Sequence, residues 1–143
     1  KEYSWDNSAR IRYDGDHKVE GNGSYRFNLQ KGWSRWVLTM KNNQGIDISG
    51  YKQIKFAVSS LSAAKWDDFK VIIQDRDDNY MVAKLGDLGF KPDGKFHWLI
   101  LEIEGIKQAG VDVSNLGKII QIAWGGGVGA NHSFHLDGLQ LLK

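Results

Sequence analysis

The chain contains no cysteine, which excludes disulfides, thiolate metal sites and cysteine nucleophiles. It has a single proline, and no apolar run reaches the roughly 18 residues that a membrane-spanning helix needs. Neither sign of charge dominates, because 19 basic and 17 acidic residues are interspersed and give a formal net charge of +2. The composition therefore indicates neither a nucleic-acid-binding protein nor a membrane protein.

Glycine and tryptophan, by contrast, are plentiful, with 17 and six residues among 143. The length and the 41% hydrophobic content predict that residues 1–143 form one domain with a core of its own. Six tryptophans exceed what a core of this size requires, which indicates that flat apolar surfaces are used elsewhere. Because the chain begins at Lys1 rather than Met, we interpret it as a mature or excised domain whose export signal lies upstream.

Short segments of alternating hydrophobicity run through the sequence. Ile54, Phe56 and Val58 alternate with Lys55 and Ala57, which is typical of a strand with one face on a core. Further strands are predicted at residues 25–29, 36–40, 69–74, 80–85, 99–103, 119–124 and 134–142. Turn-forming clusters separate them, and no long helical pattern occurs. This pattern predicts an all-β fold, an antiparallel β-sandwich.

One local motif occurs twice. Asp47-Ile48-Ser49 is echoed by Asp112-Val113-Ser114, and each copy leads toward a predicted strand. An acidic side chain followed two positions later by serine can cap a single turn of backbone. We therefore expect two matched turns that each deliver the chain into a strand.

Five segments occur in an order that is found in a known family, and together they cover most of the chain. They are residues 19–24, 32–37, 47–56, 119–124 and 134–141. In these segments the chain resembles the β-jelly-roll carbohydrate-binding modules with a galactose-binding-like fold, and family 11 most of all. The resemblance implies non-catalytic binding of β-glucan chains, β-1,4 or mixed-linked β-1,3-1,4, in an open cleft on one sheet.

The same resemblance implies a secreted, extracellular protein in which the module targets an attached glycoside hydrolase domain to its polysaccharide. A second reading stays open. The closing pattern also occurs in the C-terminal galactose-binding-like domain of some exo-acting β-glucan hydrolases. Such a domain packs on its catalytic domain and binds no sugar itself.

Two tryptophans are candidate stacking platforms. Trp33 and Trp36 have opposite parity in a strand, and Trp36 is in phase with the apolar residues that follow, so Trp33 is predicted to be exposed. Trp33 and Trp124 both fall where the family carries a binding aromatic. Trp124 is also in phase with Ile122, which would place it in the core instead. Gln121 has the opposite phase and is either solvent-facing or a hydroxyl partner of the sugar.

The most polar passage runs from Gln74 to Tyr80. Gln74 and Arg76 share a phase and can hydrogen-bond sugar hydroxyls, while Tyr80 supplies a ring. The alternative is an ordinary solvated hairpin tip. The family has no matching residues here, so this prediction depends on the residue types alone.

A structural calcium ion is also implied by the resemblance. Asp137 matches a family ligand position, and Glu20 and Asp6 are candidate co-ligands, with backbone carbonyls completing an oxygen shell. Asp137 interrupts an apolar strand, which requires an explanation if the carboxylate is buried. A hydrogen bond from a backbone amide is the alternative explanation.

Catalysis is not predicted. A glycosidase needs two facing carboxylates, and Glu102 and Glu104 are the pair that would share one face of a strand, about 7 Å apart by strand rise. Their place at the solvent-bound end of that strand favours a surface role. A small jelly-roll glycan hydrolase or lyase would need one of them to prove catalytic. Trp98, in phase with Ile100, lies either at a second part of the cleft or over the edge of the sandwich.

Overall fold

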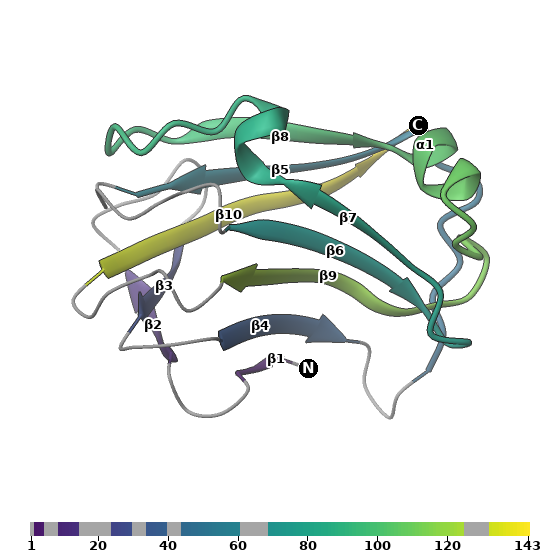
Figure 1. Ribbon diagram of the computed structural model, residues 1–143, viewed down its shortest axis with the longest axis horizontal. Helices are drawn as coiled ribbons and strands as arrows, with labels where there is room; N and C mark the ends of the chain where they lie inside the picture. The colour runs from purple at the N-terminus through teal and green to yellow at the C-terminus, as the bar shows by residue number, and fades with distance from the viewer. Residues whose placement is uncertain are drawn as a thin grey trace.

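The computed structural model describes residues 2–4, 9–14, 24–29, 34–39, 44–60, 69–124 and 132–143. Within these ranges the strands form two antiparallel sheets (Figure 1). The first sheet has the order β1 (Glu2–Ser4), β4 (Ser34–Thr39), β9 (Leu116–Trp124), β6 (Lys70–Asp75) and β7 (Tyr80–Lys84). The second has the order β2 (Ala9–Asp14), β3 (Ser24–Leu29), β10 (His132–Leu142), β5 (Gln53–Ser59) and β8 (His97–Glu102). The predicted antiparallel β-sandwich is confirmed.

The alternation in the sequence appears directly in the burial of the strands. In β8, Leu99 and Leu101 face the core and are at most 4% exposed. Trp98 and Ile100 point to the other side of the sheet and are 39% and 41% exposed. Residues that alternate along a strand lie on opposite faces, so one face is committed to the core and the other to solvent.

Aromatic side chains join the two sheets through the core. Phe69, just before β6 of the first sheet, stacks on Phe134 of β10 in the second sheet, with ring centroids 5.6 Å apart. Phe90 lies against the same ring at 6.4 Å. All three are at most 2% exposed. Burial of such rings supplies much of the apolar area that stabilises a sandwich of this size.

The two matched turns pair with each other. Asp47 Oδ1 accepts bonds from the amide and hydroxyl of Ser49 at 2.9 and 2.6 Å, and Asp112 Oδ1 does the same for Ser114 at 3.0 and 2.6 Å. The segments lie side by side, because the Ile48 amide donates to the Val113 carbonyl at 2.8 Å. The predicted capped turns are thus confirmed, and they close one end of the sandwich together.

The prediction was wrong where the chain leaves β8. The strand ends at Glu102, and α1 (Ile103–Gln108) begins at the next residue. Glu104 therefore lies on a helix, 3.5 Å from the Lys107 ammonium, while Glu102 accepts a bond from the Gln53 amide at 2.8 Å. The two carboxylates do not share a strand face as predicted.

A short 3₁₀ helix, η3 (Leu85–Leu88), follows β7 directly. Its first residue is Leu85, so the strand predicted over 80–85 ends one residue earlier, at Lys84. Leu85 is fully buried. No helix in the described part of the chain has the length and apolar character needed to cross a membrane.

Candidate functional site

A buried carboxylate organises the hairpin between β6 and β7. Asp75 is 2% exposed, and its Oδ1 accepts the backbone amides of Asp77 and Asn79 at 2.9 and 3.0 Å. Its Oδ2 accepts the Asn79 side-chain amide at 3.0 Å and the Asp112 backbone amide at 2.9 Å. Burial by itself would raise the pKa of Asp75, but these hydrogen bonds, led by that of Asp112, outweigh it and hold the pKa below its ordinary value.

The hairpin presents a row of polar groups beside this carboxylate. Gln74 lies directly opposite Tyr80 in the ladder, and Tyr80 is 61% exposed. The Gln74 amide donates to Asp78 at 3.0 Å and its oxygen accepts from the Lys118 ammonium at 3.0 Å. Asp78 has φ 66°, a left-handed conformation that aspartate tolerates in tight turns. The Gln74 side chain is thus fixed between its two neighbours.

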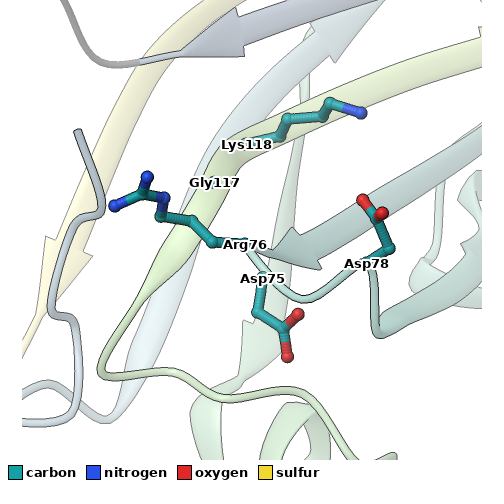
Figure 2. A pocket seen from close by; sticks show the side chains of 5 residues that line it. All are labelled: Asp75, Arg76, Asp78, Gly117 and Lys118. Carbon is teal, nitrogen blue, oxygen red and sulfur yellow. The ribbon is translucent and has the colours of Figure 1, made fainter. Parts of the chain in front are cut away.

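Arg76 lines a pocket at the turn of the β6–β7 hairpin. The pocket has a volume of about 190 Å³ and is lined by Asp75, Arg76, Asp78, Gly117 and Lys118. Figure 2 shows the side chains of Arg76 and Lys118 extending to opposite sides of it.

Two glycines leave room for the Arg76 side chain. A methyl group at Gly117 would lie 3.2 Å from Arg76 Cγ, and one at Gly45 would lie 3.1 Å from Arg76 Cδ and overlap Asn115 Oδ1. The aliphatic stem of the arginine therefore packs closely over the backbone at these two glycines.

Two of the other predicted contact residues, Gln121 and Trp124, lie on the same sheet. Gln121 lies opposite Ile72 of β6 and Val37 of β4. Trp124 ends β9 opposite Ser34, the first residue of β4. Their side chains are outside what the structure describes, and Trp33, the residue before β4, lies outside the described residues altogether. The stacking roles of Trp33 and Trp124 stay predictions.

The strand register bears on whether Trp124 is a stacking platform or a core residue. Ile122, two residues earlier, lies opposite Val71, which is fully buried. Cross-strand partners share a face, so position 122 is on the core-facing side of the sheet and position 121 on the outward side. Position 124 is in phase with 122 as long as the strand stays regular.

Lys118 is a member of this cluster that the sequence reading missed. The strand was expected to start at residue 119, whereas β9 begins at Leu116. The contact with Gln74 depends on the pairing of β6 with β9, whose register shifts on both sides of Gln74. Sequence spacing carries no signal for that contact.

The calcium prediction concerns β10 of the second sheet. Asp137 is half-buried, and its Oδ1 accepts the backbone amide of Gly138 at 2.8 Å. This hydrogen bond from a backbone amide is the alternative to calcium for explaining why a carboxylate occurs in this strand. Glu20 and Asp6 lie outside the described residues, and the described part of the chain holds no group of three acidic or histidine side chains suited to a metal. Calcium binding stays a prediction.

Trp98 does not belong to the polar cluster of the hairpin. It lies on β8, in the second sheet, where the Lys55 ammonium is 4.5 Å from the ring centroid. The arrangement is a cation–π contact on the outward face of that sheet. Trp98 is therefore separated by the whole sandwich from the outward face of β6 and β7.

Comparisons with known proteins identify the fold. No family model matches the sequence, and no curated protein matches it. Among solved structures, the family 30 carbohydrate-binding module of a cellulosomal cellulase from Clostridium thermocellum is similar at a TM-score of 0.73 and 13% identity, covering 99% of this chain and 90% of the module. The family 11 module from Clostridium thermocellum, in complex with a β-1,3-1,4-mixed-linked tetrasaccharide, is similar at a TM-score of 0.65 and 13% identity, covering 99% and 87%.

An exo-β-agarase contains a similar unit, with a TM-score of 0.76, 11% identity and 98% of this chain covered. The match spans only 22% of the agarase chain. At these identities the likeness establishes architecture, and the expected jelly-roll sandwich is confirmed. The chain has the β-sandwich fold of the family 30 and family 11 carbohydrate-binding modules.

Proposed function

We propose that the chain is a non-catalytic module that binds β-glucan chains, β-1,4 or mixed-linked β-1,3-1,4, on the outward face of the first sheet. The observation that carries this proposal is the pairing of Gln74 with Tyr80 across the β6–β7 ladder, with the Lys118 ammonium bonded to the Gln74 side chain. Arg76, the third sugar contact in this proposal, belongs to the same hairpin and lines the pocket with Lys118.

The chemistry of the cluster suits a sugar chain. A pyranose ring has an apolar CH face, which packs on an exposed aromatic ring, and a rim of hydroxyls that need polar partners. Tyr80 offers the ring, and the side chains of Gln74, Arg76 and Lys118 offer amide, guanidinium and ammonium groups. The bonds that hold Gln74 in place reduce the entropy lost when a hydroxyl binds it.

The cleft extends in this proposal across β6 and β9 toward β4. Gln121 is the next hydroxyl partner, and Trp33 is a stacking platform at the far end. Trp124 is a second platform in this proposal, which requires that the end of β9 depart from the regular phase that groups position 124 with the core-facing position 122. The module is secreted and holds an attached glycoside hydrolase domain against the polysaccharide, and it carries out no reaction itself. A calcium ion on Asp137, Glu20 and Asp6 stabilises the fold away from the sugar.

Native affinity electrophoresis tests the proposal. Gels containing barley β-glucan, xyloglucan, xylan or laminarin are run with wild type and with Tyr80→Ala, Trp33→Ala and Trp124→Ala. Wild type is retarded by barley β-glucan, and Tyr80→Ala weakens that binding by about five- to tenfold because the stacking surface is lost. Trp98→Ala is the matched control, since it removes an exposed aromatic from the other sheet. Unhindered migration of wild type in every gel would reject sugar binding.

A second candidate function is a packing domain that contacts a catalytic domain and binds no sugar. The observation that favours it is the presence of the same fold within longer chains. The match covers 22% of the exo-β-agarase and 22% of a β-1,2-glucanase from Parabacteroides distasonis. This candidate predicts no retardation by any polymer and loss of the exposed Tyr80 or Trp98 surface when the neighbouring domain is present.

A further inference from the structure

Strand register defines a line of positions that crosses the outward face of the first sheet. Arg35 of β4 lies opposite Ala123 of β9, Ala123 lies opposite Lys70 of β6, and Lys70 lies opposite Lys84 of β7. Partners in register share a face of the sheet. These four positions are called the basic row, and at a strand spacing of about 4.8 Å they span about 14 Å.

The face of the row is set by the burial of its neighbours. Val71 follows Lys70 in β6 and is fully buried, whereas Lys70 itself is exposed. In β7, Ala83 packs against the core while Lys84 is exposed. Both lysines are therefore on the outward side, the same side as Tyr80 and Gln74.

The pairing of Lys70 with Lys84 is unfavourable for folding. Like charges directly opposite each other in a sheet repel and destabilise it. Neither lysine forms an ion pair with any described residue. The acidic residues nearest along the chain to Lys84, Asp78 and Asp87, lie beyond the two ends of β7, and those nearest to Lys70, Asp67 and Asp68, lie outside the described residues. Lysine is common on an edge strand such as β7, because charge there prevents pairing with another chain. That role does not account for the second lysine, Lys70, at the same register position of the inner strand β6.

No acidic residue occupies the positions that register assigns to this outward face from β4 to β7. Those positions are Arg35, Val37, Thr39, Lys70, Ile72, Gln74, Tyr80, Val82, Lys84, Lys118, Gln121 and Ala123. Four of the twelve are cationic although the whole chain is nearly neutral. The excess of positive charge is thus local to the strand positions of this face. At the hairpin turn, Asp77 and Asp78 are exposed, and Asp78 accepts the Gln74 amide.

We propose that this surface prefers β-glucan chains that carry anionic substituents, whose carboxylate or sulfate groups contact the basic row. The inference rests on the proposed function, because it places the charged groups of the glycan beside the contacts of Tyr80 and Gln74. Arg35 and Ala123, at one end of the row, are next to Ser34 and Trp124. Gln74 and Tyr80 of the hairpin lie four residues along their strands from Lys70 and Lys84. A bound chain therefore lies between the row and the hairpin. A glycan anion relieves the repulsion between Lys70 and Lys84, which no ion pair among the described residues compensates.

The test uses two soluble polymers with the same β-1,4-glucan backbone, neutral hydroxyethyl cellulose and anionic carboxymethyl cellulose. Binding is measured by isothermal titration calorimetry in low and high salt. Wild type binds carboxymethyl cellulose about fivefold more tightly in low salt, and high salt removes the difference by screening. The double variant Lys70→Gln/Lys84→Gln loses about five- to tenfold on the anionic polymer and stays within twofold on the neutral one.

The matched control is Lys52→Gln/Lys107→Gln, which removes the same charge from β5's entry and from α1. It binds both polymers as wild type does. An equal loss with this control would assign the attraction to net charge and overturn the inference. Equal wild-type affinity for the two polymers overturns it as well but leaves the proposed glucan binding intact. Binding to neither polymer rejects both proposals.

Stability gives an independent readout of the same row. Lys84→Gln raises the urea midpoint, because it removes the repulsion with Lys70, while it lowers affinity for carboxymethyl cellulose. A variant that is merely misfolded would lose both stability and binding. A midpoint that falls on this substitution would show that the two charges do not repel and would remove the basis of the inference.

Discussion

The substitution Asp75→Asn isolates the group that organises the β6–β7 hairpin. The carboxylate accepts four hydrogen bonds, two on each oxygen. The asparagine side chain has one oxygen and one NH₂ group in place of the two carboxylate oxygens. In either orientation of the amide, the NH₂ group therefore replaces an oxygen that accepted two bonds, and it faces their two N–H donors. Each lost bond to a charged, buried acceptor costs about 1.5 kcal/mol. We expect Asp75→Asn to lower the free energy of unfolding by about 3 kcal/mol.

Urea unfolding followed by tryptophan fluorescence measures this change. The midpoint falls while the m-value stays constant, because the folded state still buries the same core. Asp77→Asn is the matched control, since it makes the same change of charge two residues later at an exposed position and shifts stability by less than about 0.5 kcal/mol. A result for Asp75→Asn within 0.5 kcal/mol of wild type, on the order of the surface value, would refute the assigned role of the four bonds.

Three further predictions concern pH, backbone conformation and metal. The pKa of Asp75 is lowered from 3.8 in the folded state, so the stability that its carboxylate contributes is complete above pH 3.8 and is lost as pH falls through the lower folded pKa. When the free energy of unfolding is measured against pH, it therefore decreases less in acid for Asp75→Asn than for wild type. Gly138→Ala lowers the free energy of unfolding, measured in urea, by about 1–2 kcal/mol, because Gly138 has φ 63° at the bulge of β10. Gly50→Ala is the control and is nearly neutral, because an added methyl group there meets nothing. Calcium raises the melting temperature of wild type and EDTA reverses the rise, while Asp137→Ala responds to neither; an unchanged wild-type melting temperature would reject the calcium site.

The strands could be predicted because burial on one face imposes a period of two. Strand β8 is a clear instance, because Leu99 and Leu101 are buried while Trp98 and Ile100, in the opposite phase, are exposed. The same rule failed at Ile103, which continues the phase of β8 but begins α1. Ile103 and Ile106, both buried, are three residues apart and carry the helical spacing that was available in the sequence.

The candidate site was only partly accessible from sequence. Gln74 and Tyr80 follow from hairpin geometry, since residues that flank a tight turn face each other across the ladder. Asp75 carries a readable signal, because it continues the buried phase of Val71 and Ile73, and an acid in that phase must be hydrogen-bonded. The contact of Lys118 with Gln74 could not be predicted, because it depends on bulged pairing between strands 44 residues apart.

Glucan binding on the outward face of β6, β7 and β9 is the central claim, and amide chemical-shift mapping tests it most directly. Uniformly ¹⁵N-labelled protein is titrated with a mixed-linked β-glucan tetrasaccharide. The account predicts the largest shifts at residues 74–80 and at Lys118, with the outward face of β5 and β8 around Lys55 and Trp98 unchanged. Shifts centred on Lys55 and Trp98, or no shifts at saturating sugar, would contradict it.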